Sequence, residues 1–93
     1  MNKAELVEVI SQKTNVSKKE TDSILTAMLE EIMAAVASGS KVTIVGFGSF
    51  EPRERQARSG RNPKTGAAVT ISATRVPAFS AGKSFKDKVA PSE

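Results

Sequence analysis

Apolar side chains recur every three or four positions through much of the first forty residues, which is the period of an amphipathic helix. Asn2 with Glu5, and Ser17 with Glu20, have the spacing of helix N-caps, in which the earlier side chain accepts a hydrogen bond from the later backbone N–H. The pattern therefore predicts two antiparallel helices joined by a short turn.

Both predicted helices end at residues that tolerate a left-handed backbone, Thr14–Asn15 and Gly39. The second helix carries a broad apolar stripe made of Ile24, Leu25, Met28, Leu29, Ile32, Met33 and Val36. This stripe is wide for one short neighbouring helix, so we expect a second copy of the chain to cover it in a symmetric dimer. The candidate core and dimer residues of this half are Leu25, Met28, Leu29 and Ile32.

Two helices with a short turn also form the helix-turn-helix motif, whose second helix enters the major groove of DNA. Away from its apolar stripe, the second predicted helix carries four carboxylates, Glu20, Asp22, Glu30 and Glu31. Carboxylates facing phosphates are repulsive. The sequence therefore disfavours the helix-turn-helix interpretation.

The second half of the chain begins with a strand pattern. Lys41–Val45 alternates and is rich in β-branched residues, Gly46–Phe47–Gly48 interrupts it, and Ser49–Phe50 resumes it. The glycines beside Phe47 predict a sharp turn with its ring buried, and the aromatic residues predict a core between sheet and helices. The candidate core residues of this half are Ile44, Phe47, Phe50 and Phe79.

Residues 51–76 predict a basic two-stranded ribbon, which we call the ribbon arm. Its ascending stretch has no large apolar residue, and Pro52 indicates edge-like or unpaired chain because it has no N–H to donate. A turn cluster at residues 60–66 separates it from a descending stretch with strand propensity. Two strands of about ten residues extend roughly 30 Å at ~3.3 Å per residue, so we expect the arm to project from a body of this size. A short helix is predicted from Lys83 onward.

Charge is divided unequally along the chain. Residues 1–50 hold five Lys and six Asp or Glu, a net of −1, whereas residues 51–93 hold nine Lys or Arg and four acids, a net of +5. An excess of positive charge concentrated in one segment is typical of proteins that bind an anionic polymer. The ribbon arm therefore predicts a nucleic-acid partner.

The chain has no Cys and no His. Disulfides, thiolate metal sites and a nucleophile–base pair are therefore not expected, and neither are catalytic residues, a metal or a cofactor. No run of apolar residues is long enough to cross a membrane. These features predict a non-enzymatic protein inside the cell with no membrane partner.

Several motifs together resemble the bacterial histone-like HU and integration host factor family. They are Gly46–Phe50, Arg55, Arg58, Gly60–Pro63, Thr65, Val76–Phe79 and Gly82–Lys83. The resemblance covers essentially the whole chain and implies one domain over residues 1–93. Within it, residues 1–50 would form the helical dimerisation body and first strands, 51–76 the ribbon arm, and 77–93 the return strand end and terminal helix.

The resemblance implies an α+β fold with a two-helix N-terminal hairpin, a three-stranded antiparallel sheet, a protruding ribbon arm and a short C-terminal helix, assembled as an intertwined homodimer. Such dimers clasp double-stranded DNA in the minor groove and bend, wrap and compact it in the bacterial nucleoid, in the cytoplasm. The proline at the arm's tip, here Pro63, is implied to wedge between base pairs. Predistorted, bent or nicked DNA is expected to bind more tightly, because part of the bending energy has already been supplied.

The implied DNA contacts fall into two groups. Those of the arm are Arg53, Arg55, Arg58, Arg61, Asn62, Pro63, Lys64 and Arg75, with Arg53 and Arg75 nearest its base. Those of the body are Lys3, Lys83 and Lys86, expected to hold flanking DNA as it bends.

Three alternatives remain open at this stage. A sequence-selective subunit of the integration host factor type is disfavoured by the short terminal helix. An RNA-binding protein is possible because an A-form duplex also offers phosphates. A structural module with a basic tail would bind its partner in a way that survives high salt, unlike phosphate binding.

Overall fold

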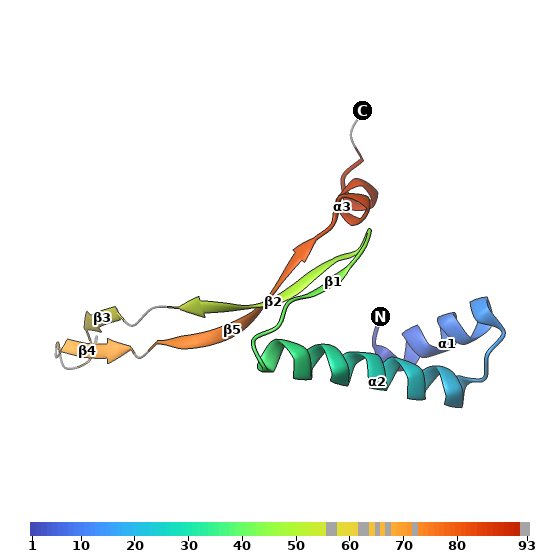
Figure 1. Ribbon diagram of the computed structural model, residues 1–93, viewed down its shortest axis with the longest axis horizontal. Helices are drawn as coiled ribbons and strands as arrows, with labels where there is room; N and C mark the ends of the chain where they lie inside the picture. Colours follow the sequence, from blue (N-terminus) through green and yellow to red (C-terminus); the bar gives the residue numbers. More distant parts are fainter. Residues whose placement is uncertain (56–57, 62–63, 65, 67, 72, 92–93) are drawn as a thin grey trace. The chain divides into compact units, whose positions relative to one another are not determined.

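A computed structural model of the chain describes residues 1–55, 58–61, 64, 66, 68–71 and 73–91. The elements follow one another along the chain as shown in Figure 1: α1 (Lys3–Thr14), α2 (Lys18–Ala37), β1 (Val42–Ile44), β2 (Gly48–Arg55), β3 (Arg58–Arg61), β4 (Ala68–Ile71), β5 (Thr74–Ala81) and α3 (Lys83–Val89). The chain divides into two compact units, a helical unit, Met1–Ala34, and a sheet unit, Ala35–Glu93.

The helices of the helical unit begin where the sequence predicts. The Asn2 side chain accepts a hydrogen bond of 2.9 Å from the Glu5 N–H, and the Ser17 hydroxyl accepts one of 3.1 Å from the Glu20 N–H. Each cap satisfies a backbone donor that has no partner inside its helix. The end of α1 is confirmed too, because Asn15 adopts the left-handed conformation with φ 59°.

The C-terminus of α2 is closed by a Schellman motif. Gly39 has φ 98°, its N–H donates to the Val36 carbonyl at 3.0 Å, and the Ser40 N–H donates to the Ala35 carbonyl at 2.9 Å. The two bonds occupy carbonyls that the helix itself leaves free. The predicted stop at Gly39 is confirmed, and it releases the chain into β1.

The predicted three-stranded antiparallel sheet is present, with strand order β1-β2-β5. The strand predicted for residues 41–45 is shorter than expected, because Val45 lies in the turn between β1 and β2. In that turn the Phe47 N–H donates to the Ile44 carbonyl at 3.0 Å, and Gly46 supplies the positive φ of 82°. Val45 is consequently 97% exposed, despite its β-branched side chain.

Beyond the pair Val42–Phe50, where the pairing of β1 with β2 stops, strands β2 and β5 continue as a two-stranded ribbon (Figure 1). Their ladder runs to the pair Arg55–Thr74, and a second ladder, between β3 and β4, starts at Arg58–Ile71 and runs outward to Arg61–Ala68. Two residues separate the ladders on each strand, so both share one register. Most of the predicted ribbon arm is therefore present.

Pro52 lies inside β2 and faces Pro77 of β5, two positions beyond Phe50, the last residue of β2 that pairs with β1. Proline has no N–H to donate, so two opposed prolines suit a non-hydrogen-bonded pair of the antiparallel ladder. In such a pair the backbone polar groups of both residues point away from the partner strand. Of the two predictions for the chain around Pro52, the edge-like strand describes this geometry. The prediction of unpaired chain is wrong, because Pro52 pairs with Pro77.

Four phenylalanines form one aromatic cluster between the sheet and α3. Phe47 lies 5.4 Å from Phe79 and 5.3 Å from Phe85 between ring centroids, and Phe50 lies 4.9 Å from Phe79. These tilted contacts are favourable for aromatic rings. The expected burial of Phe47 is nevertheless incomplete in a single chain, because Phe47 and Phe79 both remain 42% exposed.

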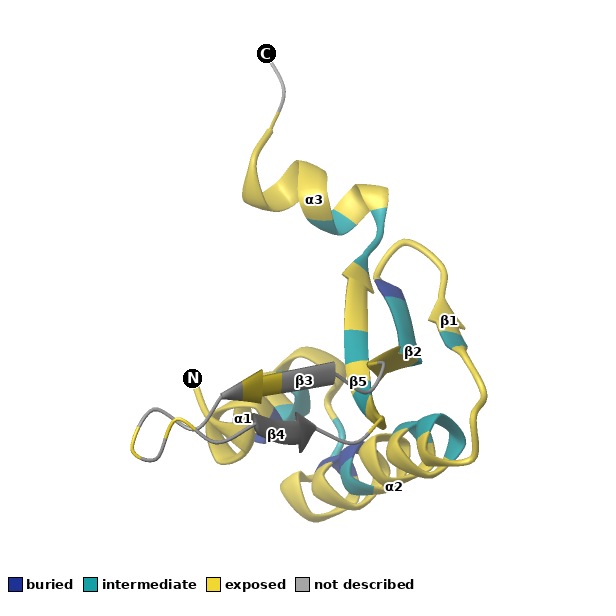
Figure 2. Cartoon of the chain, turned by 90° about the vertical axis from the view of Figure 1, so that its left-hand side faces the viewer, coloured by how far each residue is buried: buried dark blue, intermediate teal, exposed yellow. Residues whose placement is uncertain are grey.

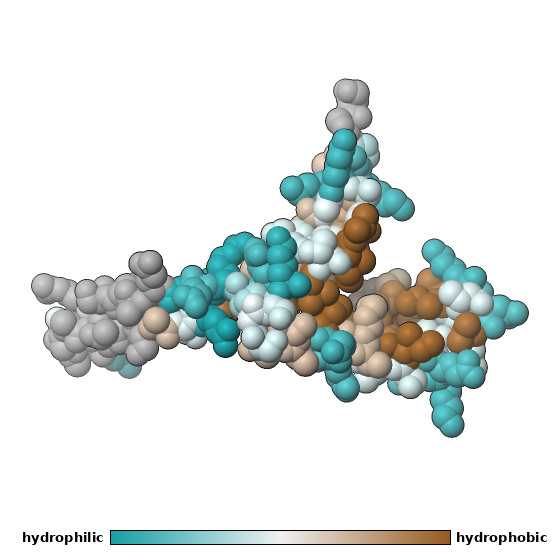
Figure 3. Space-filling view, in the orientation of Figure 1, coloured by the Kyte–Doolittle hydropathy of each residue, from teal (hydrophilic) through white to brown (hydrophobic). Residues whose placement is uncertain are grey.

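Burial in the described residues is sparse, as Figure 2 shows. Val7 and Leu25 are the only buried apolar side chains among them, while Ile24 of α2 is 66% exposed and Met33 is 62% exposed. The other predicted core residues are half-buried or exposed. Figure 3 shows hydrophobic side chains on the surface of the helical unit.

The exposed apolar stripe of α2 fits a chain whose core is completed by a partner. With its helices, sheet, ribbon and terminal helix in the predicted order, the α+β architecture is confirmed.

Candidate nucleic-acid interface

Two arginines lie on one face of the ribbon at its base. Arg53 and Arg55 are two positions apart in β2, so their side chains leave the same side of the strand, and both are exposed. Arg53 Nη2 lies 3.6 Å from Glu51 Oε1, and the other oxygen of that carboxylate lies 4.0 Å from Lys41 Nζ. Arg55 has no such partner among the described side chains.

Arg75 lies on the opposite strand and turns toward the end of α2. It faces Glu54 in the β2–β5 register. Its Nη2 donates to the Ala37 carbonyl at 3.4 Å, which places a cation beside the C-terminal end of a helix. Arg75 therefore has an intramolecular role at the base of the arm in addition to the DNA contact that the sequence predicts.

The outer part of the arm is described through its backbone. Arg58 and Arg61 belong to β3, and Lys64 follows them as an exposed residue. Asn62 and Pro63, which carry the predicted minor-groove contact and wedge, lie outside the described residues. Their roles stay predictions.

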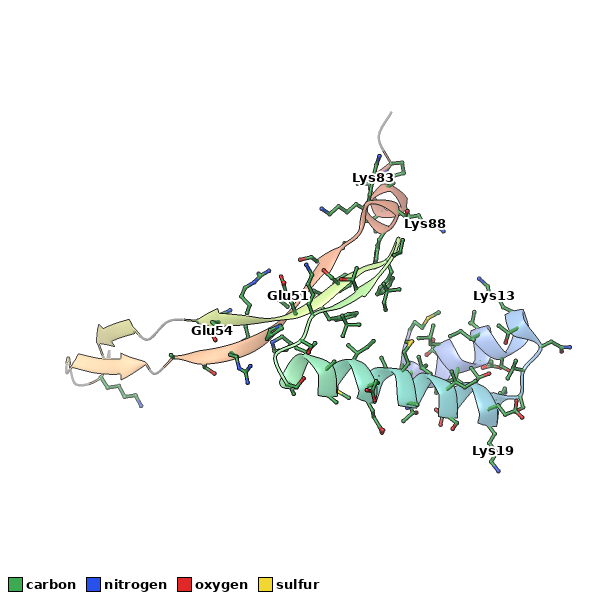
Figure 4. The ribbon with its side chains drawn as sticks, viewed as in Figure 1. Lys13, Lys19, Glu51, Glu54, Lys83 and Lys88 are labelled. Carbon is green, nitrogen blue, oxygen red and sulfur yellow. The ribbon has the colours of Figure 1, made fainter. Side chains whose placement is uncertain are left out.

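The lysines of α3 form a second exposed basic group. Lys83 and Lys86 are three positions apart, which places them on one side of the helix. Lys88 adds a third ammonium in the last turn, and Figure 4 shows Lys83 and Lys88 projecting from the helix. Within the described part of the chain, none of the three has an ion-pair partner.

Lys3 of the helical unit is held by its own chain. Its Nζ donates to Thr26 Oγ1 at 2.6 Å and lies 3.7 Å from Asp22 Oδ1. An exposed ion pair of this kind contributes little to stability. The ammonium can therefore exchange these partners for a phosphate at small cost.

The sequence motifs assign no binding role to Lys41 or Glu51. Lys41 precedes β1, whose Val42 pairs with Phe50, so Lys41 comes opposite Glu51 across the strands. This juxtaposition depends on register, which the residue types alone do not specify. The signal in the sequence was that Lys41 is a basic residue separated from the basic ribbon by only one short strand and one turn.

Other kinds of site find no support in the described segments. They contain no group of three or more His, Cys, Asp or Glu side chains placed to hold a metal ion. None of their helices combines the length and the apolar character needed to cross a membrane.

The chain combines a basic two-stranded ribbon with an open apolar stripe on α2. A family model described as "Bacterial DNA-binding protein" matches residues 1–90, and the chain belongs to that family. Two of its curated relatives carry the name DNA-binding protein HU. The HU of Nostoc sp. is 65% identical over 91 residues, spanning 98% of this chain and 97% of the relative. The HU of Synechocystis sp. is 58% identical over 97 residues, with the same coverage.

Solved structures agree with this assignment. A cocrystal structure of Anabaena HU with DNA matches with a TM-score of 0.92 at 64% identity, covering 99% of this chain and 100% of that one. HU from Thermotoga maritima matches with a TM-score of 0.68 at 37% identity, covering 96% and 98%. The resemblance inferred from the sequence motifs is confirmed for HU.

Proposed function

We propose that this chain is a homodimeric architectural protein that binds double-stranded DNA without strong sequence preference and bends it. The observation that carries the proposal is the likeness, over 99% of the chain, to an HU protein crystallised with DNA. A chain 64% identical to that protein, with the same fold, is expected to recognise the same kind of polymer.

The ribbon arm supplies the means of binding. Arg53 and Arg55 present guanidinium groups on one face of β2, and Arg58 and Arg61 extend the basic series along β3. Guanidinium groups bind phosphate oxygens whatever the base sequence. The arm reaches the minor groove, whose hydrogen-bonding groups distinguish mainly A·T from G·C pairs. Binding is therefore broad in sequence.

Bending follows from what the tip and body do together. Pro63 inserts as an apolar wedge between base pairs, at a cost of a few kcal/mol of unstacking, and Asn62 meets minor-groove acceptors beside it. Lys3, Lys83 and Lys86 then hold the flanking duplex. The bend is stabilised because it brings more phosphates to the protein.

The homodimer is part of the mechanism, because two arms are needed to clasp one duplex. Ile24, Met28, Leu29 and Met33 expose apolar surface along α2 in the single chain. Covering this surface with a second copy gains hydrophobic free energy at about 25 cal/mol per Å². Leu25 and the half-buried Ile32 extend the same interface inward.

The protein acts by binding alone, without catalysis or cofactor, on DNA of the bacterial nucleoid in the cytoplasm. Its residues 1–93 work as a single domain in which body and arms contact the same duplex.

A salt series of binding to intact and nicked duplexes of two unrelated sequences tests the proposal. We expect affinity to fall steeply with salt, because phosphate binding releases counterions. It should be similar for the two sequences and higher at the nick.

Other outcomes would assign a different function. A large preference for one sequence would indicate a sequence-selective relative of the integration host factor type. Affinity that survives high salt would indicate a structural module that binds another partner. Failure to bind duplex DNA would refute the proposal and make RNA the next ligand to test.

A further inference from the structure

The three-stranded sheet has one polar face, formed by the β2 residues that alternate with the phenylalanines. On it, Lys41 stands beside β1, Glu51, Arg53 and Arg55 lie along β2, and β5 contributes Ser80, Ala78, Val76 and Thr74. The opposite face carries the aromatic residues Phe50 and Phe79. The polar face therefore holds three cations and a single acid among the described residues.

That acid is shared by two of the cations. Glu51 Oε1 lies 3.6 Å from Arg53 Nη2, and Glu51 Oε2 lies 4.0 Å from Lys41 Nζ. The carboxylate side chain is 33% exposed, whereas the two cationic side chains are 58% and 61% exposed. Figure 4 shows Glu51 projecting from β2 within the sheet.

We infer that Lys41, Glu51 and Arg53 form a further phosphate-binding site at the base of the ribbon arm, in which Glu51 lowers DNA affinity by occupying both cations. We call these three residues the base triad. The inference rests on the proposed function, because the ligand is the phosphate backbone of the same duplex. It gives Lys41 a binding role, and it gives Glu51 the role of an internal competitor.

The geometry favours competition between Glu51 and phosphate for the same two cations. Exposed ion pairs at 3.6 and 4.0 Å are weak, since water solvates both partners and long side chains lose freedom in holding them. DNA phosphates compete with this carboxylate for the same two cations, so the ion pairs reduce the engagement of these cations by DNA without abolishing it. The Ala78 side chain opposite Glu51 adds no polar group that could take over its role.

The test compares Glu51→Gln with Glu54→Gln in the full chain. Both substitutions remove one negative charge from β2, and glutamine keeps the size of the side chain. Glu54 lies on the other face of the strand, opposite Arg75, and has no ion pair with Lys41 or Arg53. Glu54→Gln therefore controls for the loss of one negative charge from β2 without removing an ion pair of Lys41 or Arg53.

We expect Glu51→Gln to bind duplex DNA more tightly at low salt and to steepen the dependence of log K on log salt. Each triad that engages one additional phosphate steepens the slope by about 0.9, so the gain shrinks about eightfold per triad between ~50 and ~500 mM salt. Glu54→Gln should change the slope much less. Equal effects of the two variants, or weaker binding by Glu51→Gln, would overturn the inference.

A double-mutant cycle identifies Lys41 as the released cation. Lys41→Gln alone should have a small effect, because Glu51 already neutralises the ammonium. In the Glu51→Gln background the same substitution should remove much of the gained affinity. If Lys41→Gln has the same effect in both backgrounds, Lys41 does not contact DNA and the inference is wrong.

The unmodified protein in the same titration separates the two proposals. If it does not bind duplex DNA at all, the proposed function fails. If it binds and the Glu51 and Glu54 variants behave alike, the base triad fails while the proposed function stands.

Discussion

Gly48, the first residue of β2, has no room for a side chain. A Cβ added there would lie 2.5 Å from the Ser80 carbonyl oxygen and 2.7 Å from two carbons of the Phe79 ring. The ring could shift, but the Ser80 oxygen belongs to the backbone of the paired strand β5. Gly48 also has φ 156°, which L residues rarely adopt. Replacing it with alanine should therefore destabilise the sheet and the aromatic cluster together.

The size of the effect follows from two contributions. Forcing an extra methyl group into a packed site costs about 1–3 kcal/mol, and an unfavourable backbone conformation costs about 1–3 kcal/mol more. Gly48→Ala should thus lower the free energy of unfolding by about 2–6 kcal/mol per chain. Even a loss of about 2 kcal/mol lowers Tm by roughly 8–16 °C for a domain of this size.

Thermal and urea unfolding followed by circular dichroism measure this loss, at one fixed protein concentration because dimer stability depends on concentration. Gly60→Ala is the matched control. Gly60 lies in β3, and no atom lies within 4 Å of the place that an added methyl group would take, so the Tm of this variant should stay close to that of the unmodified protein. An unchanged Tm for Gly48→Ala would show that the sheet yields at this position and refute the reasoning.

Three further substitutions test the binding surface and the core. Pro63→Ala should reduce the bend of a duplex, followed by energy transfer between dyes at its ends, more than it reduces affinity; an unchanged bend would rule out the wedge. Arg55→Ala should weaken binding to unrelated sequences alike and flatten the salt slope by about 0.9 per arm, and a loss confined to one sequence would contradict phosphate binding. Leu25→Ala should lower the free energy of unfolding by about 2–5 kcal/mol in urea titrations, because Leu25 is only 8% exposed; an unchanged midpoint would show that the site is not packed.

Features encoded by neighbouring residues were predictable from the sequence. The caps at Asn2 and Ser17 and the stop at Gly39 each depend on residues within a few positions of one another, so residue type and spacing suffice. The start of α3 at Lys83 was predictable for the same reason. The confirmed order of elements rests on these local signals.

Features that depend on pairing between strands or chains were harder to predict. Val45 has strand propensity, yet the position of Gly46 in the turn takes it out of β1. The contact between Lys41 and Glu51 requires the β1–β2 register, which the length of that turn sets. The partial exposure of Phe47 reflects surface that a single chain leaves open.

The opposed prolines Pro52 and Pro77 have a consequence for behaviour in a crowded cell. Exposed strand edges are templates on which other chains can pair, because they offer rows of unused N–H and C=O groups. At this step of the ribbon neither edge has an N–H to offer, since both residues of the pair are prolines. A strand from another molecule that approached either edge of the ribbon would find no N–H donor at this position. The position lies beyond Phe50, where β1 no longer pairs with β2. The paired prolines therefore disfavour the addition of a third strand at this step of the ribbon.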